Sequence, residues 1–235
     1  MPRTTLGMWL ALDSVARCAA AWQRDRGHCA AERERAQAIA TAPRRAQFLG
    51  GRWLAAQCLA AQHGGDAAAW QMACTPGQAP RVLDGPTAER PWLSLAHRGD
   101  VLACALADRP VGVDVEVLGR MRGAPDERAE LMLAPIELAH YAGVPPAERE
   151  ALLLSHWTLK EAWAKRGGHG LSLGGMPELA AQQVARGGNA RLWHAGGLVV
   201  ALCADADAAW PQPRGQGLDA VEAQAWQVGA LDAPR

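Results

Sequence analysis

The clearest alternation of apolar and polar positions runs from residue 111 to residue 117, where the chain reads VGVDVEV. Side chains of a strand point to opposite faces with a period of two. The valines therefore share one face, and Asp114 and Glu116 stand together on the other, with Gly112 leaving room beside them. Alternating or short apolar runs predict further strands at 8–12, 92–96, 101–106 and 191–204.

Apolar residues at a spacing near 3.6 predict helices. The segment 43–62 carries such a stripe, Thr41 is its candidate cap, and the glycines after His63 end it. The segment 147–166 follows two prolines and is closed by two glycines, which are start and stop signals. Helices are also expected at 16–40 and 126–141, turns at 76–91, and an irregular tail after residue 210.

A weak internal similarity relates residues 97–108 to residues 194–205. Each is preceded by a helix with a central tryptophan, and the shared order of helix, turn, strand and strand suggests two related halves. We therefore predict an α+β fold of two similar α/β halves, with a site between them. The predicted boundaries are 1–110 and 111–210, followed by an irregular tail at 211–235.

Composition limits the class of protein. The 235 residues are 49% hydrophobic, enough for one large or two small folded domains, and the formal net charge of zero argues against bulk nucleic-acid binding. The six cysteines have no C-x-x-C spacing, which favours buried thiols in a reducing compartment. The apolar run at 8–12 is short and ends at Asp13, so we expect no signal peptide or membrane span. We expect the protein to be cytoplasmic and monomeric.

Only two of the 24 basic residues are lysines, Lys160 and Lys165, and both lie in the sequence KEAWAK. An ammonium is compact and can lose its proton, unlike a guanidinium. Lysines that persist in so arginine-rich a chain suggest a need for a point charge or a transferable proton. The alternative is that their proximity is an accident of composition.

Two motifs carry candidate chemistry. Asp114 and Glu116 suit a hard cation such as Mg²⁺, which prefers oxygen ligands; alternatively, they form the wet face of a half-exposed strand. Glu161 and Lys165 share one face of the predicted helix, where the carboxylate can bind a metal while the lysine meets a phosphate. The alternative is an ordinary salt bridge beside a core tryptophan, Trp157.

Together these motifs resemble those of the 4′-phosphopantetheinyl transferases of the surfactin-synthetase-activating type. The V-G-[IV]-D-[IV]-E strand and W-[ST]-x-K-E-[AS]-x-x-K helix of that family match residues 111–116 and 157–165 in order and spacing. Residues 168–173 are similar to its G-x-G-L-S-[LF] loop, 94–97 to its S-x-S-H strand end, and 32–52 to its arginine-rich first helices.

The resemblance implies transfer of 4′-phosphopantetheine from coenzyme A to a serine of an apo acyl or peptidyl carrier protein, which gives the holo carrier and 3′,5′-ADP. It implies a pseudo-duplicated fold and a Mg²⁺ ion held by Asp114, Glu116 and Glu161. The other implied roles are phosphate contact by Lys165 with help from Lys160, general base catalysis by Glu137, coenzyme A binding by His97 at the 3′-phosphate end, and basic binding positions at Arg33, Arg45 and Arg52.

Two positions depart from the family's pattern. Ala96 stands where the family usually has serine, and Gln47 where an arginine is common. Both remove a donor to coenzyme A. They leave a second hypothesis open, a non-catalytic relative that binds the carrier or coenzyme A without turnover.

Another Mg²⁺-dependent phosphotransfer enzyme is a third possibility, although the chain has no P-loop motif. For an acidic carrier, Arg120 and Arg122 are candidate contacts beside the metal strand.

Overall fold

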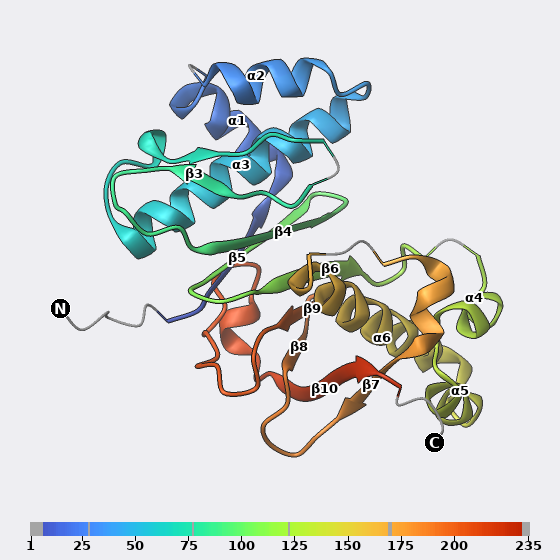
Figure 1. Cartoon of the computed structure of the whole chain (residues 1–235). Helices are drawn as coiled ribbons and strands as arrows, with labels where there is room; N and C mark the ends of the chain where they lie inside the picture. The colour runs from blue at the N-terminus through green and yellow to red at the C-terminus, as the bar shows by residue number, and fades with distance from the viewer. Residues whose placement is uncertain (1–6, 28, 77, 122, 169–170, 232–235) are drawn as a thin grey trace. The chain divides into compact units, whose positions relative to one another are not determined.

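The computed structural model describes residues 7–27, 29–76, 78–121, 123–168 and 171–231 (Figure 1). The chain forms two compact units, one of residues 1–111 and 209–219, the other of residues 112–208 and 220–235. Both contain helices and strands, so the predicted α+β class is confirmed. The similarity of the two halves stays a prediction. Among the described residues, no helix is long and apolar enough to cross a membrane.

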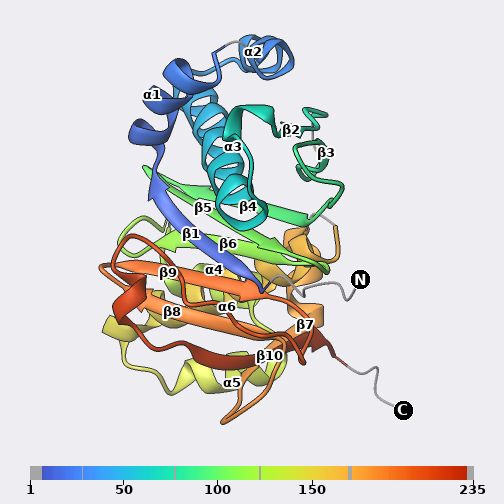
Figure 2. The same ribbon diagram turned by 90° about the vertical axis from the view of Figure 1, so that its left-hand side faces the viewer.

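The first unit is built on an antiparallel sheet with the strand order β1-β5-β4. Helix α3 lies over one face of this sheet (Figure 2). The strands are β1 (Trp9–Ser14), β4 (Trp92–Arg98) and β5 (Val101–Ala107), with a small hairpin of β2 (Gln71–Met72) and β3 (Val82–Asp84). The helices are α1 (Val15–Asp25), α2 (Ala30–Gln37), α3 (Ala42–His63) and the 3₁₀ turn η1 (Ala67–Ala69).

The core of the first unit forms where α3 meets β5. Leu59 on the helix and Leu106 on the strand are fully buried in it, together with Cys104. A Cβ atom at Gly50 would lie 2.9 Å from Leu102 Cδ1, so glycine lets the helix approach the strand closely. All six cysteines are free thiols; four of them are buried as the sequence predicts, whereas Cys29 and Cys74 are only half-buried.

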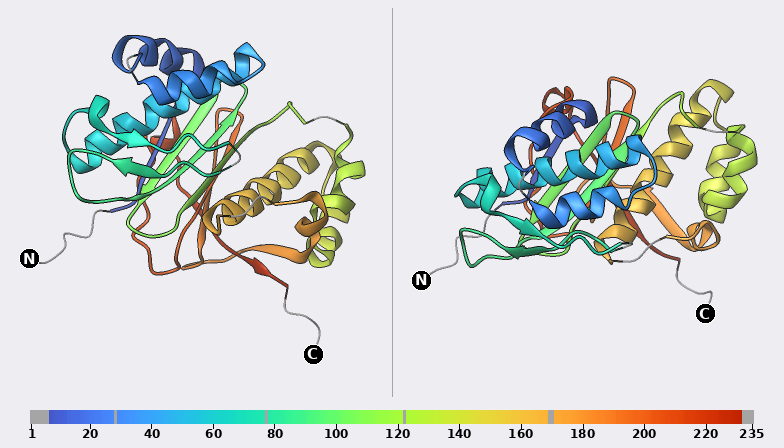
Figure 3. Two further views of the ribbon diagram at one scale, coloured as in Figure 1. Left: turned by 45° about the horizontal axis from the view of Figure 1, so that its top comes forward. Right: turned by 90° about the horizontal axis from the view of Figure 1, so that it is seen from above.

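The second unit contains a five-stranded antiparallel sheet with the order β6-β9-β8-β10-β7. The long helix α6 packs on it (Figure 3). The strands are β6 (Gly112–Val117), β7 (Leu179–Gln183), β8 (Ala190–Ala195), β9 (Leu198–Cys203) and β10 (Gln224–Ala230). The helices are α4 (Pro125–Met132), α5 (Pro135–Ala142), α6 (Pro146–Arg166) and the 3₁₀ segments η2 (Leu173–Glu178) and η3 (Leu218–Ala220).

Three predictions of local structure need correction. The expected helix at 16–40 is two helices, and the one at 126–141 is α4 and α5, separated by the residues just before Pro135. A proline disfavours helical backbone in the residue before it, which explains that break. The predicted strand at 191–204 is the hairpin of β8 and β9, since Gly196 and Gly197 take positive φ values.

The tail after residue 210 is not irregular. Its strand β10 lies between β8 and β7 in the sheet of the second unit. Before that strand, the Arg214 backbone exchanges hydrogen bonds with Leu10 and Leu12 of β1, and its guanidinium lies 3.9 Å from the centre of the Trp9 ring. The apolar residues of β10 are few, and its pairing partners are distant in sequence, so the local pattern gave little sign of it.

Candidate active site

Strand β6 and helix α6 approach each other at Gly112. A Cβ atom there would overlap the backbone carbonyl of Ala162 and the backbone nitrogen of Arg166. The room that the glycine leaves is therefore filled by the backbone of α6. This close approach brings the two sequence motifs together, because Asp114 lies on the strand and Lys165 on the helix.

Lys165 binds Asp114 directly. Its Nζ donates to Asp114 Oδ1 over 2.7 Å. The Asp114 residue is buried, with 8% of its surface exposed, whereas the Lys165 side chain is 30% exposed. The ammonium therefore lies between a buried carboxylate and solvent, where it can exchange this partner for another anion.

Glu161 adds a second carboxylate to this cluster. Burial raises the pKa of Glu161, the negative charge of Asp114 raises it further, and Lys165 opposes both. Two carboxylates that repel each other in a partly buried site are better accommodated when a cation joins them. The donor set of Asp114 and Glu161 therefore fits a hard divalent ion.

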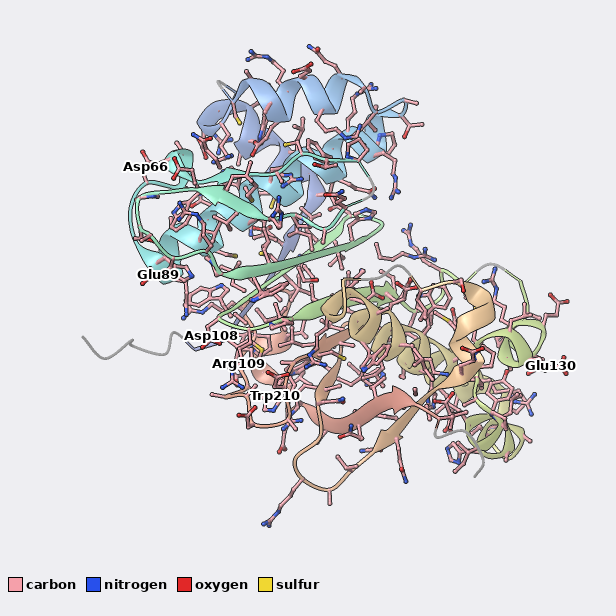
Figure 4. All side chains as sticks on the ribbon, viewed as in Figure 1. Asp66, Glu89, Asp108, Arg109, Glu130 and Trp210 are labelled. Carbon is pink, nitrogen blue, oxygen red and sulfur yellow. The ribbon has the colours of Figure 1, made fainter. Side chains whose placement is uncertain are left out.

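Glu116 stands two residues along β6 from Asp114, and it too is buried, with 9% of its surface exposed. Both faces of this strand are covered, so the wet-face interpretation of the two acids is wrong. Glu130 of α4, by contrast, is an exposed acid whose side chain points outward (Figure 4). Burial of two carboxylates costs free energy unless charge or hydrogen bonds compensate it.

No group of three or more His, Cys, Asp or Glu side chains in the described part of the chain is arranged to hold a metal ion. Lys165 occupies one oxygen of Asp114 in this arrangement. Joint metal binding by Asp114, Glu116 and Glu161 thus stays a prediction.

Lys160 and Glu137 form a separate buried cluster. Lys160 is completely buried, and its Nζ donates to Glu137 Oε2 at 2.6 Å and to the carbonyls of Met132 and Met176 at 2.8 and 3.1 Å. These three bonds use all the protons of the ammonium. Lys160 therefore joins α6 to the segments at the end of α4 and in η2.

Glu137 is equally well bound. Its Oε2 also accepts from the Ala134 backbone at the start of α5, and its Oε1 accepts from the Ala181 backbone and lies 3.1 Å from His156 Nδ1. Burial alone would raise the pKa of Glu137, but His156 and Lys160 outweigh it, and the pKa lies below its usual value.

A buried carboxylate with a lowered pKa is a weak base. These contacts favour a structural role for Glu137 and Lys160. Their predicted catalytic roles remain untested.

Apart from Lys165, the predicted coenzyme A contacts lie in the first unit. His97 Nε2, at the end of β4, lies 3.1 Å from Arg44 Nη1 at the start of α3. Gln47 donates to the Gly99 carbonyl at 3.3 Å, so this departure from the family's pattern has a local structural role. Arg44 was not among the predicted residues. In the sequence, only its position at the start of the predicted helix could have pointed to a contact with His97.

The other predicted arginines have different surroundings. Arg33 and Arg45 donate to backbone carbonyls of Gly27 and Ile39 at 2.7 and 2.8 Å. Arg52 is buried, its guanidinium lies 4.9 Å from the centre of the Phe48 ring, and burial lowers its pKa. The positive charge of Arg26 also contributes to lowering the pKa of Arg52, so both His97 and Arg52 lie near a second basic side chain.

Two loop predictions are partly outside the described residues. Arg122, and His169 and Gly170 of the G-x-G-L-S loop, lie outside them. Arg120 is exposed after β6. Ser172 Oγ accepts from the Gly175 backbone at 3.2 Å and caps η2, which gives that serine a structural role.

Comparison with known proteins supports the motif set. Residues 110–210, which include the close approach of β6 and α6, match the model of the 4′-phosphopantetheinyl transferase superfamily. The predicted family resemblance is confirmed. Asp114, Glu161 and Lys165 all fall within the matched residues.

Two curated relatives agree with this result. A 4′-phosphopantetheinyl transferase of Bacillus subtilis is 28% identical over 80 residues, and the 4′-phosphopantetheinyl transferase psf-1 of Bacillus pumilus is 33% identical over 81 residues. Each match covers 34% of this chain and 34% of the relative. The chain therefore matches about a third of the length of these relatives.

Proposed function

We propose that the chain transfers the 4′-phosphopantetheine group of coenzyme A to a serine of an apo acyl or peptidyl carrier protein, releasing 3′,5′-ADP. The observation that carries this proposal is the cluster of Asp114, Glu161 and Lys165, which two separate motifs contribute. The superfamily match over the same region supports it.

The carboxylates are proposed to hold Mg²⁺ through Asp114, Glu116 and Glu161. When bound, the ion would neutralise negative charge on the pyrophosphate. Lys165 would leave Asp114 and donate to a phosphate oxygen, which stabilises the charge that develops on the leaving group. Its partial exposure makes this exchange possible without unfolding the site.

The proton of the acceptor serine needs a base that Glu137 is poorly placed to supply. Both Glu137 oxygens already accept bonds from buried donors. We therefore propose that Glu137 and Lys160 position α5, α6 and β7 and take no direct part in proton transfer.

Coenzyme A consumption tests the transferase against the non-catalytic alternative. An apo carrier, coenzyme A and Mg²⁺ are incubated with the chain, and 3′,5′-ADP is followed by chromatography. We expect ADP to form in proportion to the carrier and not with a carrier whose acceptor serine is alanine. Binding of the carrier without ADP formation would support the non-catalytic relative instead.

Removal of divalent ions is expected to stop the reaction. With EDTA, Asp114 and Glu161 keep their mutual repulsion and the pyrophosphate loses its counterion. Activity should return when Mg²⁺ is added in excess over the chelator. A transfer rate that is the same with and without EDTA would show that the reaction does not require a divalent ion.

Lys165→Arg is expected to lower kcat about a hundredfold although the charge is kept, because misplacement by about an ångström can cost this much. A planar guanidinium is wider than the ammonium that lies 2.7 Å from Asp114. Steady-state kinetics on Lys165→Arg and Lys165→Met measure the effect. A wild-type kcat for the arginine variant would show that the residue supplies charge alone.

An acidic carrier would be attracted by local positive charge, since the chain has no net charge. The KM for the carrier is expected to rise with ionic strength, because salt screens exposed charges. Arg120→Ser should raise KM at low salt and reduce its salt dependence. Identical KM values at low and high salt would exclude electrostatic attraction.

A further inference from the structure

Strand β6 and helix α6 both contribute to the proposed metal site. Asp114 and Glu116 lie on the strand, and Glu161 lies on the helix. One ion meets all three side chains only when the spacing of the two elements is held within a fraction of an ångström. Because β6 is the edge strand of the described sheet and pairs there with β9, contacts with α6 must set this spacing.

The backbone of β6 meets α6 at Gly112, where the backbone of the helix takes the place of a side chain. Glu150, in the second turn of α6, makes another backbone contact, at the turn that follows the strand. Its Oε1 accepts hydrogen bonds from the N–H groups of Gly119 and Met121, at 3.0 and 3.4 Å. Glu150 therefore binds the chain just beyond the end of β6.

These two contacts lie near opposite ends of the strand. The strand advances about 17 Å from Gly112 to Val117. The helix rises about 18 Å from Glu150 to Ala162, whose carbonyl lies closest to a Cβ atom built at Gly112. Strand and helix therefore run alongside each other in opposite directions and are joined at both ends. The three acids of the proposed site lie between these ends, two on the strand and one on the helix.

Other contacts of the turn do not fix its position along the helix. The Leu118 backbone donates to the Gly197 carbonyl at 2.8 Å, which ties the turn to the end of β9 and not to α6. Leu118 and Met121 pack against the core that the sheet shares with α6. Apolar packing is non-directional, whereas hydrogen bonds have a defined geometry. The Glu150 carboxylate is therefore the directional contact between this turn and the helix.

The surroundings of Glu150 suit this task. The residue is half-buried, and hydrogen bonds to an ionised carboxylate are stronger than those between neutral groups. Gly119 has a φ of 74°, a left-handed conformation that glycine adopts without strain, so the turn can present its N–H groups to the helix. Glu148, two residues before Glu150 in α6, is by contrast exposed.

We propose that Glu150 is a positioning residue for the metal site. It holds the end of β6 against α6, opposite to Gly112, and so keeps the acids of the strand at the distance from Glu161 that one divalent ion requires. Glu150 acts through the strand and does not contact the ion. This inference rests on the proposed Mg²⁺ site and extends it to a residue that lies three helical turns from Glu161.

Metal binding tests this role without turnover. Mn²⁺, which like Mg²⁺ prefers oxygen ligands, is titrated into the full chain with coenzyme A present. Free Mn²⁺ is measured by electron paramagnetic resonance and corrected for binding to coenzyme A alone. We expect Glu150→Ala to bind Mn²⁺ about 10- to 100-fold more weakly than the wild type, as the loss of a group that orients metal ligands does. Glu150→Gln keeps an acceptor oxygen and should bind nearly as tightly as the wild type.

Glu148→Ala is the matched control, because it removes the same charge from an exposed position of the same helix. It should bind Mn²⁺ like the wild type. Alanine is favourable in helices, so both alanine variants should unfold at similar urea concentrations. Wild-type Mn²⁺ affinity in Glu150→Ala, or an equal loss in Glu148→Ala, would overturn the positioning role alone. A wild-type chain that binds no Mn²⁺ would overturn the proposed metal site and this role with it.

Discussion

Lys160→Ala is expected to lower the free energy of unfolding by about 3–5 kcal/mol, the cost of breaking a buried ion pair by removing one partner. Lys160 is completely buried, and its loss removes the buried positive charge that pairs with Glu137 and a donor to the Met132 and Met176 carbonyls. Burial lowers the pKa of Lys160 although Glu137 acts to raise it, so the loss of hydration outweighs the ion pair at this lysine.

The second lysine of the chain is the matched control. Lys165 also pairs with a carboxylate, but its side chain is 30% exposed and water can replace it. Lys165→Ala should therefore cost no more than about 1 kcal/mol. Urea unfolding of both variants, followed by circular dichroism, measures the difference. Equal stabilities would contradict the structural role of Lys160.

Asp114→Ala is expected to lower the transfer rate at least about a hundredfold, since a metal supplies several kcal/mol of transition-state stabilisation. Asp114 is both the hydrogen-bond partner of Lys165 and a proposed Mg²⁺ ligand, so the change affects the lysine and the metal site together. Lys165 can turn to solvent, and the fold should survive.

Glu130→Ala is the control for this change. It also removes one acid from the second unit, but from the exposed surface of α4. Its rate and its unfolding midpoint should match those of the wild type. A loss of activity in Glu130→Ala equal to that in Asp114→Ala would mean that net charge, and not the cluster, controls the rate.

The regular patterns of the sequence predicted the central elements well. The alternation at 111–117 gave β6, and the segments between proline and glycine signals gave α3 and α6. Elements that depend on distant partners were missed. β7 and β10 pair with each other although they are distant in sequence, and both contain several polar residues and only a few large apolar ones to mark them.

The site was predictable as far as side chains share one element. Two acids on one strand face, and an acid and a lysine one helical turn apart, are local relations. That the two lysines belong to separate clusters could not be predicted. Lys160 pairs with Glu137, 23 residues away in sequence, and Lys165 pairs with Asp114, 51 residues away. Scarcity alone suggested one shared task, whereas the fold gives them two.

The mass of an apo carrier protein tests the central proposal most directly. The carrier is incubated with coenzyme A and Mg²⁺, together with either the wild-type chain or Asp114→Ala, and its intact mass is measured. We expect the carrier to gain the mass of one phosphopantetheine group with the wild type and to keep its original mass with the variant. An unmodified carrier after incubation with the wild type, or an equal gain with Asp114→Ala, would contradict it.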